Sequence, residues 1–127
     1  MRFIVSGQLR SGKNNMGINP RTGRHYPKKE WAAWRDGVVA QLMPQRRGTI
    51  ISTPVKAIIN YWRSDGRRRD VPGMMDALWH CLERAFVVKD DALISSVEWN
   101  EMGINKADPK IEIILTKIGL DKKTPIS

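Results

Sequence analysis

Two hydrophobic periods alternate along this chain, and together they limit the folds that it can adopt. Val55, Ala57, Ile59 and Tyr61 recur at every second position, the period of a β-strand with one apolar face. Apolar residues at the spacing of an α-helix follow at about 72–85. In chain order, the patterns predict a strand at 3–5, a helix at 28–43, a strand at 55–62, a helix at about 72–85, an extended segment at 92–99 and a strand at 110–116. This β-α-β-α-β-β order predicts an α+β, or mixed α/β, fold.

Length and composition predict one small domain over residues 1–127, with a polar tail at about 119–127 that is expected to fray. Residues 7–26 are rich in glycine and asparagine and read as a long polar loop. Cys81 is the only cysteine, so no internal disulfide can form and a reducing compartment fits. No apolar run approaches the roughly 20 residues that a membrane span needs. We therefore expect a cytoplasmic protein that does not contact a membrane.

The charge balance points to a polyanionic partner. Lysine and arginine number 22 against 13 acidic residues, a net charge of +9. Nucleic acid is the commonest polyanion that such an excess attracts, although a generically basic small protein is the alternative. Arg67, Arg68 and Arg69 lie side by side immediately before Asp70. Neighbouring cations are favourable where a phosphate lies between them, although most such runs are simply solvated.

Four aspartates near the second predicted helix are candidate metal ligands, because carboxylates hold hard divalent cations against phosphates. Each also has a structural interpretation. Asp70 can cap the helix, and Asp90 with Asp91 can form a turn or cap. Asp76 lies inside the helix, on the side that it shares with His80 and Glu83, where exposed acids are common. The sequence alone does not show that these side chains converge.

The stretch from Gly7 to Lys13 has the spacing of a phosphate-binding P-loop. That motif needs serine or threonine at the next position and then a helix, but Asn14 follows and Pro20 comes soon after. We therefore expect no nucleotide cofactor. A basic, glycine-bearing loop that touches a nucleic-acid backbone fits these residues better, and a plain surface loop is the alternative.

The acidic and basic residues together resemble a known family, the RusA-type Holliday-junction resolvases of bacteria and their phages. The resemblance is carried by Arg67-Arg68-Arg69-Asp70, by Leu82 and Ala85 before Lys89-Asp90-Asp91, and by Ser11-Gly12-Lys13-Asn14-Asn15, Thr22-Gly23-Arg24 and Trp34-Arg35. It covers most of the chain, and its specific part spans about 25 residues between Arg67 and Asp91.

The resemblance implies a homodimer that binds four-way DNA junctions and cuts two strands with Mg²⁺, or with Mn²⁺, in recombination and repair. It also suggests a phage or prophage origin. Asp70 and Asp91 correspond to catalytic carboxylates, and Asp90 is the neighbour in the pair. The DNA contacts expected from the resemblance and the basic surface are Lys13, Asn14, Asn15, Arg24, Arg67, Arg68, Arg69 and Lys89.

Two positions depart from the family pattern. The family's second catalytic aspartate falls on Pro72 here, and its helix lysine falls on Asp76. Positions 72 and 76 lie on one side of a helix, so the missing carboxylate is hypothesised to have moved to Asp76. The resulting hypothesis is a magnesium-dependent, structure-specific endonuclease with Asp70, Asp76 and Asp91 as metal ligands. The alternative is a non-catalytic basic DNA-binding protein, a decayed resolvase.

Overall fold

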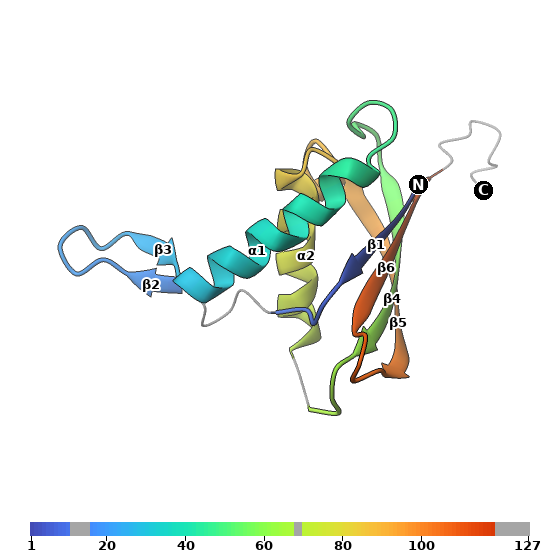
Figure 1. The fold of residues 1–127 in the computed structure, drawn as a ribbon. Helices are drawn as coiled ribbons and strands as arrows, with labels where there is room; N and C mark the ends of the chain where they lie inside the picture. Colours follow the sequence, from blue (N-terminus) through green and yellow to red (C-terminus); the bar gives the residue numbers. More distant parts are fainter. Residues whose placement is uncertain (11–15, 68–69, 119–127) are drawn as a thin grey trace.

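The structure is a computed structural model that describes residues 1–10, 16–67 and 70–118 (Figure 1). It contains a four-stranded mixed sheet with two α-helices on one of its faces, so the expected α+β class is confirmed. Five residues expected to contact DNA lie outside the described residues, namely Lys13, Asn14, Asn15, Arg68 and Arg69, as does the tail 119–127. Within the described ranges, no helix is both long and apolar enough to cross a bilayer.

The elements follow the predicted order, with one correction in the segment expected to be a loop. They are β1 (Arg2–Ser6), β2 (Met16–Ile18), β3 (His25–Pro27), α1 (Lys29–Leu42), the 3₁₀ turn η1 (Met43–Gln45), β4 (Val55–Arg63), α2 (Val71–Arg84), the 3₁₀ turn η2 (Asp91–Leu93), β5 (Ile94–Ile104) and β6 (Lys110–Lys117). The correction is that residues 7–26 are not one polar loop. They contain β2 and the start of β3, which pair as a small antiparallel hairpin.

The strand order β1-β6-β4-β5 fixes where the ends of α2 lie. β4 pairs antiparallel with β6 but parallel with β5, so the chain must return along the sheet before β5 begins. α2 makes this return. Its first residue therefore lies at the end of the sheet where β4 finishes, and its last residue lies where β5 starts (Figure 1).

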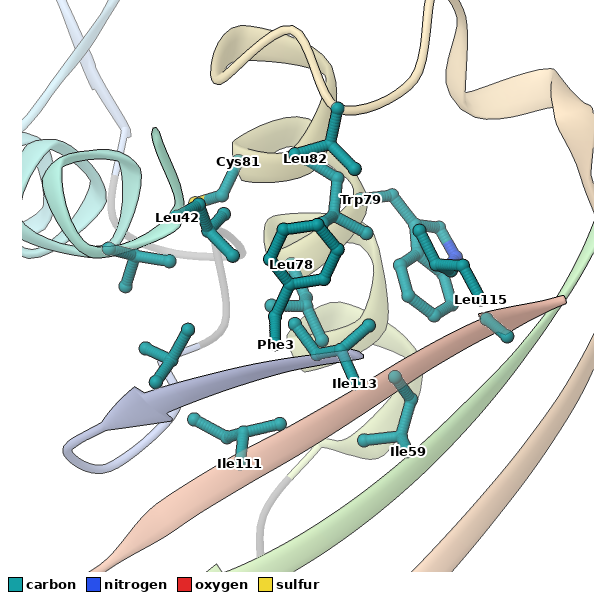
Figure 2. Packing of buried hydrophobic residues seen from close by; sticks show 14 of the residues in the cluster. Phe3, Leu42, Ile59, Leu78, Trp79, Cys81, Leu82, Ile111, Ile113 and Leu115 are labelled. Atoms are coloured by element: carbon teal, nitrogen blue, oxygen red, sulfur yellow. The ribbon is translucent and has the colours of Figure 1, made fainter. Parts of the chain in front are cut away.

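The core fills the space between the two helices and the covered face of the sheet (Figure 2). Burial in β4 alternates as predicted, with Val55, Ala57, Ile59 and Tyr61 fully buried. The apolar stripe of α2 includes Leu78 and Leu82 as expected, but Met74 rather than Met75 is fully buried. Cys81 also lies in the core, where burial raises the pKa of its thiol to about 12, so it is no nucleophile at neutral pH.

Two glutamines from the first helical segment cover the free edge of β1. The amide of Gln41 bonds both the N–H and the C=O of Ser6, at 2.8 and 3.2 Å. Gln45 does the same for Ile4, at 2.9 and 2.8 Å. The two side chains thus bond backbone groups that an edge strand would otherwise leave without a partner strand. These bonds attach α1 and η1 to the sheet.

Candidate active site

Three carboxylates gather at the C-terminal end of α2. Glu83 lies in the last turn of the helix, and Asp90 and Asp91 lie just beyond it, at the entrance to β5. One carboxylate oxygen from each residue lies within 4.8 Å of those of the other two, and all three residues are exposed. We refer to Glu83, Asp90 and Asp91 as the acidic group.

A tight reversal after α2 brings the acidic group together. The helix ends at Arg84, Ala85 is its C-terminal capping residue, and Phe86 adopts a left-handed conformation with φ of 60°. The N–H of Val87 then donates to the C=O of Leu82 at 3.0 Å, which turns the chain back over the helix end. Backbone bonds between Ile51 and the segment 87–89 hold the returning chain in place.

Local hydrogen bonds orient the two aspartates differently. The side chain of Asp90 accepts from the N–H of Ala92 at 2.9 Å, so it caps η2, as one of its alternative interpretations predicted. The N–H of Asp91 donates to the carboxylate of Glu83 at 3.1 Å. Glu83 is therefore tied to the backbone at Asp91, which keeps both carboxylates at the same helix end.

The charges of the acidic group repel one another. Partial burial raises the pKa of Asp91, and Glu83, Asp90 and the more distant Asp76 raise it further. Three carboxylates are hard oxygen donors of the kind that Mg²⁺ prefers, and their exposure leaves room for water and phosphate oxygens as further ligands. The donor chemistry therefore fits a divalent cation, which would relieve the repulsion.

Asp76 lies on the same face of α2 as the acidic group, two turns before Glu83. By helical rise the two Cα atoms are about 10 Å apart. Asp76 is exposed, and its charge acts on the pKa of Asp91. His80 lies between them, with its ring centroid 6.0 Å from that of Trp31 of α1. Asp76 thus borders the acidic group without belonging to it.

Asp70 lies at the other end of α2. It is the N-terminal capping residue, although no side-chain capping bond forms from it in the described part of the chain. Thirteen residues of helical rise separate it from Glu83, about 20 Å. This separation follows from the parallel pairing of β4 and β5. Within one chain, the structure therefore does not bring Asp70 and Asp91 to a common ion.

The described basic residues that were expected to bind DNA lie in three places. Lys89 is exposed and immediately precedes the acidic group, and its N–H donates to the C=O of Ile51 at 2.8 Å. Arg67 is exposed in the turn before α2, where its N–H donates to the carboxylate of Asp65 at 3.0 Å. Arg24 lies in the turn of the β2–β3 hairpin. The cations are therefore spread along the molecule, as contacts to an extended polyanion require.

Glu83 is the member of the acidic group that sequence reasoning did not select as a ligand. Its spacing carried a signal, because it lies seven residues after Asp76 and so on the same helix face. The missing information was the reversal at Phe86, which places Asp90 and Asp91 beside Glu83 rather than further along the chain.

Comparison with known proteins extends the resemblance over most of the chain. No protein-family model matches it. "Crossover junction endodeoxyribonuclease RusA" from Aquifex aeolicus (strain VF5) is 29% identical over 85 residues, which are 67% of this chain and 68% of the relative. The protein of that name from Escherichia coli (strain K12) is 27% identical over 106 residues, 84% of this chain and 88% of the relative. The protein from Enterobacteria phage 82 has the same identity and coverage.

Proposed function

We propose that this chain, which is similar to the RusA crossover junction endodeoxyribonucleases, cuts four-way DNA junctions with the help of a divalent metal ion. The observation that supports this most is the convergence of Glu83, Asp90 and Asp91 at one end of α2. Exposed acids are common on proteins. Three that crowd together beside Lys89, in a chain with a net charge of +9, are better explained by a cation and a phosphate than by solvent alone.

In this proposal the acidic group holds the ion. A bound Mg²⁺ supplies Lewis-acid activation of a water molecule and neutralises charge on the phosphate that is cut. Glu83 and Asp90 each accept one backbone N–H, that of Asp91 and that of Ala92, and these bonds fix their carboxylates beside that of Asp91. Each has a second carboxylate oxygen that would face the ion. Lys89 and Arg67, which lie beyond opposite ends of α2, hold the DNA backbone. Arg68 and Arg69, outside the described residues, stay further proposed DNA contacts.

In this proposal, Asp70 reaches the ion site from a second copy of the chain. It lies about 20 Å of helix from Glu83, and no single ion spans that distance. Asp70 can therefore share the ion at Asp91 only if it comes from another subunit. A two-fold homodimer, which the family resemblance implies, also suits a branched substrate, because each subunit then meets an equivalent strand.

A cleavage assay with a labelled four-way junction tests the function. We expect paired nicks with Mg²⁺ or Mn²⁺, none with EDTA, and no cutting of a linear duplex of the same sequence. Tight binding to the junction without nicks under either metal would instead support the non-catalytic alternative, which the proline at position 72 motivates. Turnover of ATP or GTP without DNA cleavage would contradict both.

Mixed dimers test whether Asp70 and Asp91 of different subunits share an ion. Asp70→Asn and Asp91→Asn chains are each expected to be inactive alone. When they are co-refolded, half of the sites in each mixed dimer regain both aspartates, so junctions should be nicked in one strand rather than two. If the ion is instead bound within one chain, each site in a mixed dimer keeps one defect, and no nicks should appear on denaturing gels.

A further inference from the structure

The β2–β3 hairpin and its flanking residues carry a concentrated positive charge that has no role at the acidic group. Residues 7–29 contain Arg10, Lys13, Arg21, Arg24, Lys28 and Lys29 and no aspartate or glutamate. This stretch therefore supplies six of the nine net positive charges of the chain. A run of cations with no acidic neighbour is complementary to a polyanion, and the homology already suggests that the polyanion is DNA.

The hairpin projects away from the sheet and from α2, beyond the N-terminal end of α1 (Figure 1). Its turn is held by side-chain and backbone hydrogen bonds of Asn19. The side-chain oxygen of Asn19 accepts from the N–H of Arg21 at 2.9 Å, and the N–H of Asn19 donates to the C=O of Arg24 at 2.8 Å. Gly23 adopts a positive φ of 69°, which glycine tolerates without strain. The turn therefore presents Arg21 and Arg24 on a defined backbone.

An aromatic ring lies next to these cations. Tyr26 is 50% exposed, although it belongs to a paired strand. The residue opposite it in the hairpin is Gly17, which has no side chain to cover the ring. Arg24, two positions before Tyr26, lies with it in the lining of an open hollow of about 650 Å³. A guanidinium and an exposed ring in one hollow suit the two parts of a nucleotide, a phosphate and a base.

We propose that the β2–β3 hairpin is an arm that binds one nucleotide of the substrate at its branch point. Arg24 and Arg21 hold backbone phosphates, and Tyr26 stacks on a base where the regular stacking of the helix arms is interrupted. This inference rests on the proposed junction substrate, because a linear duplex offers no such interruption within its length. The arm then contributes to the preference for branched DNA, separately from the ion site at the far end of α2.

Replacing Tyr26 tests the stacking. In EDTA, where no cutting occurs, Tyr26→Ala is expected to lower the affinity for a four-way junction about tenfold. Its affinity for a linear duplex should change less than twofold, and Tyr26→Phe, which keeps the ring, should bind both DNAs as the wild type does. Fluorescence anisotropy with labelled DNA measures all three. Equal losses on junction and duplex, or no loss on either, would overturn the stacking role.

Replacing the arginines tests the phosphate contacts. The Arg21→Ala/Arg24→Ala variant should bind both DNAs more weakly, and the slope of log affinity against log salt should shrink by about 2. The charge-matched control is Lys106→Ala/Lys117→Ala, which should leave the slope unchanged; both lysines are exposed and lie outside the hairpin, Lys106 in the turn between β5 and β6 and Lys117 at the end of β6. If both pairs shift the slope equally, the hairpin has no special part. If the wild type neither binds nor cuts junctions, the proposed function fails instead.

Discussion

Replacing Asp91 with asparagine is expected to lower the rate of metal-dependent junction cleavage by more than about 100-fold, because changes to outer-shell partners of metal ligands already cost about 10- to 100-fold. Asp91 is the member of the acidic group on which the charges of the others act most clearly, since burial, Glu83 and Asp90 all raise its pKa. Asparagine keeps the shape of the side chain but removes the charge that binds the ion. The single-turnover cleavage rate, measured at saturating enzyme, reports this loss.

The loss should appear in catalysis and not in folding or DNA binding. The raised pKa of Asp91 means that the folded state disfavours the charged carboxylate. This penalty is absent at a pH below the unfolded pKa, grows as the pH rises from the unfolded toward the folded pKa, and is complete above the folded pKa. Asparagine removes it, so the melting temperature in EDTA should not fall. Affinity for the junction in EDTA should be equal or higher, because one repulsive charge near the phosphate is gone.

Three further substitutions separate the acidic group from its neighbours. Asp108→Asn is the matched control, because Asp108 is also exposed but lies in the turn between β5 and β6. It should cut at the wild-type rate. Glu83→Gln should lose activity as Asp91→Asn does. Unaltered cleavage by Asp76→Asn would reject Asp76 as a ligand, and unaltered cleavage by Asp91→Asn would remove the basis of the metal proposal.

The long elements of the fold could be predicted because each carries its period in its own residues. The alternation from Val55 to Tyr61 directly indicated a strand with one buried face. β2 and β3 could not be found this way, because each has three residues and too few positions to show a period. Their pairing depends on the turn at Asn19 and Gly23, whose glycine and proline neighbours read as an ordinary loop.

The sequence predicted that the candidate site is built from carboxylates, but not which carboxylates lie together. Asp90 and Asp91 were selected from the sequence, and whether they bind metal stays a prediction. Their partner depended on the reversal at Phe86, which brings Glu83 to Asp91. This reversal has no sequence signal of its own, because its left-handed position is occupied by phenylalanine and not by glycine. The separation of Asp70 from Glu83 does follow from spacing, because the length of the predicted helix sets it.

Removing the ring of Phe3 is expected to have the largest effect on stability. Phe3 is fully buried, although it lies in the edge strand β1, and it projects into the core beside Leu78 and Ile113 (Figure 2). Phe3→Ala should lower the free energy of unfolding by about 3–5 kcal/mol, because it loses both apolar burial and close packing. Urea denaturation followed by circular dichroism measures the loss.

The neighbouring residue provides the control for this change. Ile4 points to the uncovered face of the same strand and is half-buried, so Ile4→Ala should lose less than half as much. Phe3→Leu, which keeps most of the apolar volume, should fall between the wild type and Phe3→Ala and remain folded for measurement. If Phe3→Ala and Ile4→Ala lost equal stability, the stability of β1 would come from its backbone bonds to β6, Gln41 and Gln45 rather than from its place over the core.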